Sequence, residues 1–473
     1  MIKDSASTDS LLLAWPSSGR RRILLDSIAG YAENLRHHGR TNPLLLAIDG
    51  KQANLDAEIN SGLEKLSKQY RSELQILDVD SRQAFLESLP TDIDRASATF
   101  SLLPLLDNGL SSSGPGRNRN MMLLAAAGEL LLASDDDIVC APAYCKKKSG
   151  GPIFSSETFP LPLRFYPDRA ALLSEVNACD CDIVAQHQQY LGHKASEFVA
   201  DDHPAAQGKI VLSCAGCYGD SGFGRARTVL ALKDKMRQHM LKFGYEQIRY
   251  SREVIRIPDN DLIGPSMVFM AGHSGYDVRE YLPPFFPIGG NEDGFFAMLV
   301  RVCILGSLKA YQSFGLLHNP PESRPYTRES LVGFKPNITE LLMALTLACM
   351  PDRSIIDTRS RMIRLGQNYV HVSDLSNSDF VEMMHRCWTQ GAMAYVEDLQ
   401  GLLDMYDRQP SLWATDIDEL LKNIYMLMRE PLALFGQTGC GLKVEQLKSL
   451  LENYGKLLTV WPDMLDFAAK KNN

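Results

Sequence analysis

Short apolar runs alternate with amphipathic helical patterns near the start of the chain, and this alternation most limits the possible folds. Apolar residues recur at helical spacing between runs that are short enough to be buried strands. The strand candidates are residues 11–15, ending at Pro16, then 44–48 and 74–77, and the helix candidates are 24–35 and 55–66. A β-α-β-α-β order predicts a doubly wound, mostly parallel sheet. Ligands of such sheets bind beyond the carboxyl ends of the strands, here Pro16–Gly19 and Asp49-Gly50.

The pattern continues with less regularity and then becomes helical. We expect helices near 118–128, before 243 and over 294–306, strands at 129–134, 209–213, 267–270 and 309–317, and a glycine-rich loop at 216–224. From about 330 onward the apolar spacing predicts helices at 341–350, 380–406, 417–428 and 442–458. The expected domains are an α/β domain over 1–330, with an insertion at about 141–207, and an all-helical domain over 331–473.

Composition excludes several classes of protein. The chain has 473 residues and a formal net charge of −8, which argues against nucleic-acid binding because that function needs a basic surface. The apolar stretch 121–133 is broken by Gly128 and Glu129 and is shorter than a transmembrane helix. Ten cysteines are scattered without a regular framework, and Met1–Asp4 does not begin a signal peptide. We therefore expect a soluble, cytoplasmic protein without transmembrane segments.

Three consecutive aspartates, Asp135, Asp136 and Asp137, follow the apolar run 130–133. Like charges at the end of a buried strand repel one another unless a cation or a basic partner offsets them, and hard divalent cations prefer carboxylate oxygens. If the strand continues through the triplet, Asp135 and Asp137 point the same way and share one ion, while Asp136 faces away. The alternative is a solvated acidic turn or a helix N-cap.

The surroundings of the triplet resemble a known enzyme family. The order Arg117-Asn118, then Gly128-Glu129, then a strand and Asp135–Asp137 is similar to the central segment of A-fold glycosyltransferases of the family-2 type. In that family an Arg-Asn pair opens a helix, a Gly-Glu pair closes it, and a strand delivers a DxD motif that contacts the ribose and the metal. The resemblance implies a sheet of the glycosyltransferase A type.

Three further positions follow the family's order. Asp49 would contact the nucleotide base, Asp293 within Gly289–Asp293 would be the general base, with Glu292 beside it, and His318 would be a metal ligand. A helix N-terminus favours a carboxylate at Asp293 through the macrodipole. The alternatives are a structural turn at Asp49, a helix cap at Asn291–Asp293 and a structural histidine.

The resemblance thus implies a complete site. The nucleotide-sugar site would comprise Pro16, Ser17, Asp49, Arg117, Arg119, Asn120, Asp135 and Asp136; the metal, Mn²⁺ or Mg²⁺, would be held by Asp135, Asp137 and His318. The metal would neutralise the leaving nucleoside diphosphate, with added charge from Arg117 or Arg119. Asp293 would deprotonate the acceptor, so the reaction would invert the anomeric carbon.

The implied function is a metal-dependent hexosyltransferase that uses a nucleotide sugar, with a UDP-sugar as the expected donor. The acceptor would be a peptide, a protein or a glycan, and the helical domain would recognise it or form a homodimer. The Gln-x-x-Arg-Trp motif of processive synthases is absent. Two alternatives remain: a nucleotidyltransferase, and a noncatalytic scaffold with a decayed transferase domain.

Two other motifs carry less weight. Gly219–Gly222 spells the nucleophile segment of trypsin-like proteases, but the chain lacks the β-rich, disulfide-bearing pattern of those enzymes. Cys214 and Cys217 have CxxC spacing, yet a zinc site of that type needs four ligands and no second CxxC exists. For Gly219–Gly222 the preferred interpretation is a glycine-rich loop that approaches substrate, or a turn.

Overall fold

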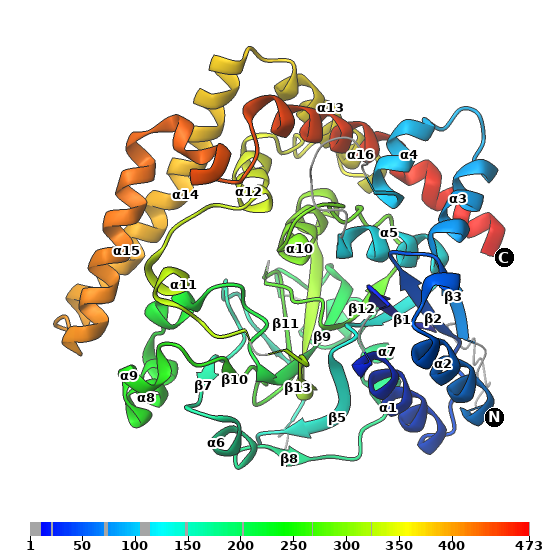
Figure 1. The fold of residues 1–473 in the computed structure, drawn as a ribbon, viewed down its shortest axis with the longest axis horizontal. Helices are drawn as coiled ribbons and strands as arrows, with labels where there is room; N and C mark the ends of the chain where they lie inside the picture. Colours follow the sequence, from blue (N-terminus) through cyan, green and yellow to red (C-terminus); the bar gives the residue numbers. More distant parts are fainter. Residues whose placement is uncertain are drawn as a thin grey trace.

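The computed structural model describes residues 11–19, 22–70, 74–104, 114–146, 150–200, 203–266, 268–322 and 324–472. Within these residues the fold is mixed α/β, with a central sheet of 13 strands. Nine of them follow the order β3-β2-β1-β4-β12-β9-β13-β11-β6, and the other four pair at its margin. A helical region follows, and Figure 1 shows it above and to the left of the sheet.

One half of the sheet is parallel and was predicted from the sequence. Its strands are β3(Leu74–Leu77), β2(Leu44–Ile48), β1(Leu11–Ser17) and β4(Leu130–Ser134), all paired in parallel. The prediction that the first strand stops at Pro16 was wrong, because β1 continues to Ser17. Its ladder with β4 ends at Ala14, so the missing N–H of Pro16 removes no bond on that side.

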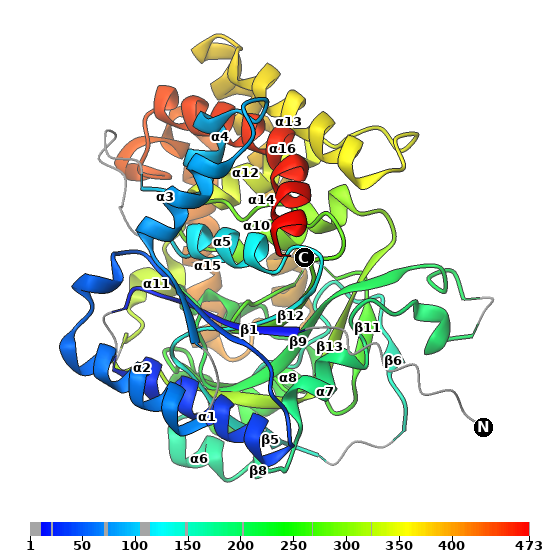
Figure 2. The same ribbon diagram turned by 90° about the vertical axis from the view of Figure 1, so that its right-hand side faces the viewer.

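Helices cover both faces of the parallel half. They are α1(Ile23–His37), α2(Ala57–Tyr70), α3(Val79–Ser88), α4(Arg95–Leu102) and α5(Pro115–Ala125), with a 3₁₀ turn at Gln52–Asn54. Leu11, Leu13 and Trp15 pack with α1 and α2, whereas Leu12 and Ala14 pack with α5. Figure 2 shows α1 and α2 on one side of β1 and α5 on the other. The strands are uniformly apolar because both of their faces are buried.

The other half of the sheet is mixed. It contains β12(His273–Asp277), β9(Lys209–Asp220), β13(Ser307–His318), β11(Leu262–Gly264) and β6(Ile153–Phe154), with β5(Ile138–Tyr144), β7(Arg164–Phe165), β8(Asn177–Ala178) and β10(Glu253–Ile255) at its margin. β12 runs antiparallel to both β4 and β9, and β13 runs parallel to β9. The helices here are α6(Arg169–Leu173), α7(Ile183–Gln188), α8(Asp234–Phe243), α9(Tyr245–Ile248) and α10(Glu292–Cys303), with 3₁₀ turns at Ala195–Glu197 and Ala226–Ala231.

Two expectations for this half were wrong. The predicted loop at 216–224 is in strand β9 as far as Asp220, because its backbone pairs with β13 and β10. The predicted strand at 267–270 is not formed by residues 268–270, and Met267 lies outside the described residues. Parts of the expected insertion join the sheet, since β6 pairs with β11 and β7 with β10.

The C-terminal region is helical, as predicted. It comprises α11(Arg328–Val332), α12(Ile338–Ala348), α13(Thr358–Ser373), α14(Asn377–Met405), α15(Ser411–Arg429) and α16(Val444–Asn472), with 3₁₀ turns at Pro431–Leu434 and Gly436–Thr438. None of the helices in the described part of the chain is long and apolar enough to cross a membrane.

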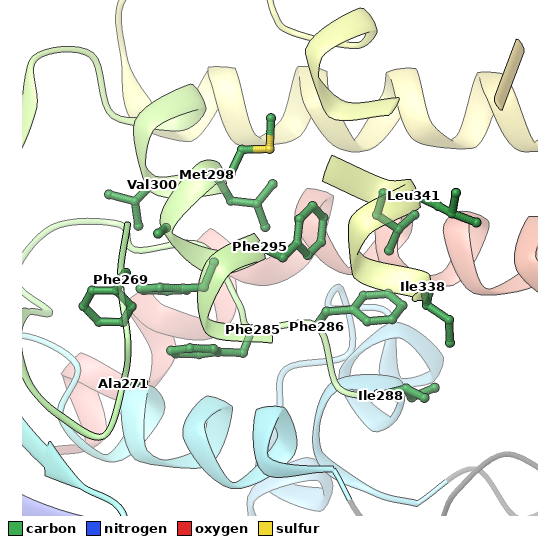
Figure 3. Close-up of a cluster of buried hydrophobic side chains, with 14 of the residues drawn as sticks. Phe269, Ala271, Phe285, Phe286, Ile288, Phe295, Met298, Val300, Ile338 and Leu341 are labelled. Carbon is green, nitrogen blue, oxygen red and sulfur yellow. The ribbon is translucent and has the colours of Figure 1, made fainter. Parts of the chain in front are cut away.

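The helical region shares a hydrophobic core with the sheet. The rings of Phe285 and Phe296 stack 3.9 Å apart, and side chains of α10, of the 285–288 segment and of α12 lie together in one cluster (Figure 3). Trp461 of α16 donates a hydrogen bond to the carbonyl of Leu282 over 2.8 Å. Asn472, at the end of the same helix, donates to the carbonyls of Leu124, Ala125 and Ala127 at the end of α5.

Candidate functional site

A cavity of about 360 Å³ lies beside the carboxyl end of β4. Its lining residues include members of the segments that carry the predicted site: Arg119, Asp135, Asp137, Asn291, Glu292, Asp293 and His318. These come from α5, from the chain after β4, from the start of α10 and from the end of β13. Segments that are far apart in the sequence therefore meet at one place.

The acidic triplet forms a tight turn and does not extend the strand. β4 ends at Ser134, and the amide of Ile138 donates to the carbonyl of Asp135 over 3.1 Å. Asp135 and Asp137 line the cavity, whereas Asp136 accepts a hydrogen bond of 2.6 Å from the Ser17 hydroxyl. As predicted, Asp135 and Asp137 face one way and Asp136 another. The turn causes this arrangement, because the strand ends before the triplet.

The bond between Ser17 and Asp136 joins the ends of β1 and β4. The strand order β3-β2-β1-β4 means that the chain runs outward from β1 to β3 and resumes at β4 on the other side of β1. This point is where the strand order reverses, and such points are where doubly wound sheets bind ligands. Asn118 also reaches this position, since its side-chain amide donates to the Ser17 carbonyl over 3.2 Å.

Arg119 is a buried cation at the wall of the cavity. Its Nη2 lies 2.7 Å from Asp135 Oδ1, and its Nε lies 3.5 Å from Glu292 Oε1. Its Nη1 has no hydrogen-bond partner among the described residues, although the side chain is only 5% exposed. A buried N–H without a partner is energetically costly, so this guanidinium suits an anionic ligand. Burial raises the pKa of Asp135 to about 6, although the charge of Arg119 opposes the rise.

His318 ends β13 and faces Asp137. Its Nε2 lies 3.4 Å from Asp137 Oδ1, and its Nδ1 lies 2.8 Å from the Asp220 carbonyl. Burial lowers the pKa of His318, but the hydrogen bond and charge of Asp137 outweigh that effect and raise it overall. When Nδ1 donates to the carbonyl, Nε2 is left as the lone-pair nitrogen, which is the arrangement of a metal-binding histidine.

Glu292 and Asp293 begin α10. Burial raises the pKa of Glu292 to about 7, and the neighbouring charge of Asp293 adds to the rise. Asp293 accepts hydrogen bonds from the amides of Gly294 over 2.8 Å and Ala271 over 3.3 Å. Asn291 stands before the helix with a φ of 60° and makes no side-chain capping bond. Asp293 is thus fixed by backbone amides at a helix N-terminus and faces the cavity.

The remaining predicted residues are not among those that line the cavity. Asn120 is buried and holds the segment before α10, because its amide group exchanges hydrogen bonds with the backbone of Phe285. Arg117 donates to the Pro287 carbonyl over 3.2 Å. Pro16 is buried within β1. Asp49 follows β2; burial lowers the pKa of Arg82 and of Arg117, and the charge of Asp49 opposes that lowering.

The sequence analysis did not identify two arginines: Arg256, which lines the cavity, and Arg252, which pairs with Asp220. Cys217 and Arg256 line the cavity together, with Arg256 Nη2 2.7 Å from Cys217 Sγ. Asp220 forms a two-bond ion pair with Arg252, at 2.6 and 2.7 Å. The sequence signals near them were the CxxC spacing of Cys214 and Cys217 and the motif at 219–222, which was interpreted as a turn or as a loop that approaches substrate. Arg252 and Arg256 belong to no sequence motif. They flank β10, which is placed beside β9 by strand pairing, and this long-range pairing leaves no local pattern in the sequence.

The predicted metal ligands offer atoms of the type that a divalent cation can bind. Asp137 and His318 supply oxygen and nitrogen atoms 3.4 Å apart, near the spacing of about 3 Å between adjacent ligands of an octahedral ion. Asp135 lines the same cavity but is bound to Arg119. Among the described residues, the three-residue group whose ligand atoms all lie within 4.8 Å of one another is a different one, formed by His37, His38 and Asp180.

No family model matches the chain, and no curated protein matches it either.

Proposed function

We propose that this cavity is the active site of a metal-dependent glycosyltransferase that uses a nucleoside-diphosphate sugar. The observation that carries the proposal is the grouping of three functions in one cavity. Asp137 and His318 offer ligands for a cation, Arg119 offers an unpaired buried N–H for an anion, and Asp293 offers a carboxylate held by backbone amides. Transfer from a sugar diphosphate needs a cation for the leaving group and a base for the acceptor.

The position of the cavity supports the same proposal. The acidic turn follows β4 at the point where the strand order reverses, and Asp49 follows β2 two strands away. Asp293 and His318 follow in the order expected of the resemblance, at the start of α10 and the end of β13. We therefore assign the α/β region to the glycosyltransferase A type, with a UDP-sugar as donor and a hexosyl group as the transferred unit.

Each residue has a defined task in this proposal. Mn²⁺ or Mg²⁺, held by Asp137, His318 and Asp135, supplies a positive charge for the diphosphate. Arg119 adds a second, fixed positive charge from the cavity wall. Asp136, held by Ser17, is directed to the donor side at the end of β1. Asp293 takes the proton from the hydroxyl of a peptide, protein or glycan acceptor. A single base and direct displacement give inversion at the anomeric carbon.

The deciding experiment is a panel of nucleotide sugars tested with the full chain, with and without Mn²⁺. We expect one donor to be hydrolysed or transferred in a metal-dependent way, with release of a nucleoside diphosphate. Asp137→Asn should slow the reaction about 100-fold, while Asp404→Asn, on the exposed face of α14, should leave it unchanged. Release of pyrophosphate from a nucleoside triphosphate would instead identify a nucleotidyltransferase. Failure to bind any nucleotide sugar in the presence of Mn²⁺ would overturn the proposal.

A further inference from the structure

A second group of potential metal ligands lies away from the cavity, at the end of α1. It consists of His37, His38 and Asp180, and we call it the α1 cluster. His37 Nε2 and His38 Nε2 each lie 3.2 Å from Asp180 Oδ1. His38 Nε2 is buried and makes no hydrogen bond with any residue that the structure describes. The two imidazoles therefore converge on one carboxylate, and one of them has an unsatisfied nitrogen.

We propose that the α1 cluster is a site for Zn²⁺ or a similar transition-metal ion, with two imidazole ligands, one carboxylate ligand and one position open to water. A tetrahedral ion with bonds of about 2.0–2.1 Å places its ligand atoms about 3.3 Å apart. The measured separations of 3.2 Å match this spacing. Nitrogen and carboxylate oxygen are ordinary zinc ligands.

The position of the cluster favours a cation. His37 is the last residue of α1, and His38 directly follows the helix. The carboxyl end of a helix carries partial negative charge. The carboxylate of Asp180 adds a full negative charge at the same place.

The segment that carries Asp180 is already fixed against α1. On one side, the amide of Cys179 donates to the Pro142 carbonyl over 2.9 Å. On the other side, Asn34 of α1 donates to the Cys181 carbonyl over 2.8 Å, and Arg40 pairs with Asp182 over 2.6 Å. Asp180 is therefore held between two anchored stretches of backbone, so a bound ion would not have to order it. The ion would link the end of α1 to the chain that follows β8.

This proposal is independent of the proposed function, and its test must separate the two sites. We would use the Asp137→Asn variant as the parent, since it removes a ligand from the cavity, and strip it with EDTA. Zinc binding would be measured by calorimetry and by metal content per chain. We expect one Zn²⁺ per chain in the parent. The further change His38→Ala or Asp180→Asn should weaken binding at least about 10-fold, because even outer partners of a ligand contribute that much.

The matched control is His193→Ala in the same parent. His193 is a half-exposed histidine whose Nδ1 lies 2.7 Å from Glu197 Oε2, so it resembles the cluster but has one acidic partner only. We expect the control to keep the zinc affinity of the parent. Co²⁺ gives a second measurement, because tetrahedral coordination has intense visible absorption that should vanish in His38→Ala.

The proposal fails if the parent takes up no Zn²⁺, or if His38→Ala and Asp180→Asn both bind it as tightly as the parent does. Asp180 is 72% exposed and His38 only 19% exposed, so Asp180→Asn is the substitution that should not impair folding. Circular dichroism of each variant would establish this. If His38→Ala fails to fold, Asp180→Asn and the Co²⁺ spectrum still decide the question.

Discussion

The two halves of the central sheet contribute differently to the cavity. The parallel half, with β1 and β4, ends in Ser17 and the acidic turn, and these polar groups are tied to each other. The mixed half, with β9, β12 and β13, contributes His318, Cys217 and the region before α10. The parallel half provides a rigid platform whose strands are paired in register. The mixed half provides the opposite wall, where chemical groups from distant segments face the platform.

This difference suggests a division of labour under the proposed function. The parallel half should bind the donor, and the mixed half should carry the proton transfer. This division can be tested. If it holds, substitutions in the parallel half should affect donor binding, and substitutions in the mixed half should affect proton transfer.

The largest effect should come from Asp293→Asn on the mixed side. Loss of a general base should reduce kcat by about 100- to 10,000-fold, while donor binding should stay within a few-fold of wild type. The measurement is kcat for transfer together with the donor Kd in the presence of Mn²⁺. Equal losses in both quantities would place Asp293 in donor binding and would remove the division.

Asp137→Asn should follow, with a loss of about 100-fold in kcat/KM, since a metal contributes several kcal/mol to charge stabilisation. The apparent affinity for Mn²⁺ should fall in parallel. His318→Gln should produce a smaller loss of the same kind. If the two residues hold one ion across the halves, the double variant should lose less than the product of the single losses. Fully multiplicative losses would mean that they act apart.

Ser17→Ala should weaken donor binding by about 10-fold, because a hydrogen bond to a charged group contributes about 1.5–3 kcal/mol. Its partner is Asp136, so kcat at saturating donor should change little. Titration with the donor identified by the panel gives both quantities. A loss confined to kcat would contradict the assignment of the parallel half to donor binding.

The last effect concerns stability and should leave the division between donor binding and proton transfer untouched. Burial raises the pKa of Glu292 to about 7, above its unfolded value, so the folded protein keeps a proton that the unfolded chain loses. This contribution to stability is complete below about pH 4.5 and is lost as pH rises to about 7. The difference in the free energy of unfolding between Glu292→Gln and wild type should therefore be about 2–3 kcal/mol more favourable to the variant at pH 8 than at pH 5.

Denaturant unfolding in EDTA at both pH values measures this difference. Glu382→Gln, exposed on α14, is the control and should show none. A Glu292→Gln effect of the same size at pH 5 and pH 8 would mean that the glutamate is not held protonated by its surroundings.

The same two halves differ in how well the sequence predicted them. The strands of the parallel half are runs such as Leu44–Ile48, buried on both faces, and their apolar composition is visible without the structure. β9 continues through Gly216 and Gly219, which locally indicate a loop. Gly219 has a φ of +110°, and a Cβ there would lie 2.5 Å from the His318 carbonyl oxygen. The glycine is thus required by the close approach of β13, which no local pattern reveals.

The site was predicted in part for the same reason. Asp135, Asp137, Asp293 and His318 lie next to elements with clear periodicity, and the structure brings them to one cavity. Arg256 gave no signal, because only the pairing of β10 with β9 carries the chain that follows it to the cavity. Asn120 was predicted at the donor, and that stays a prediction; its hydrogen bonds with Phe285, which hold the chain leading to α10, were not predicted.

The contact between Asn472 and the end of α5 has a consequence for the timing of assembly. The bonded residues are 345 to 348 positions apart, so at about 5–20 residues per second the ribosome adds Asn472 about 20–70 seconds after α5. During that interval the carbonyls of Leu124, Ala125 and Ala127 lack this partner, and the apolar surface that α16 covers is open to solvent. The helix that carries Arg119 therefore reaches its final packing only when α16 docks.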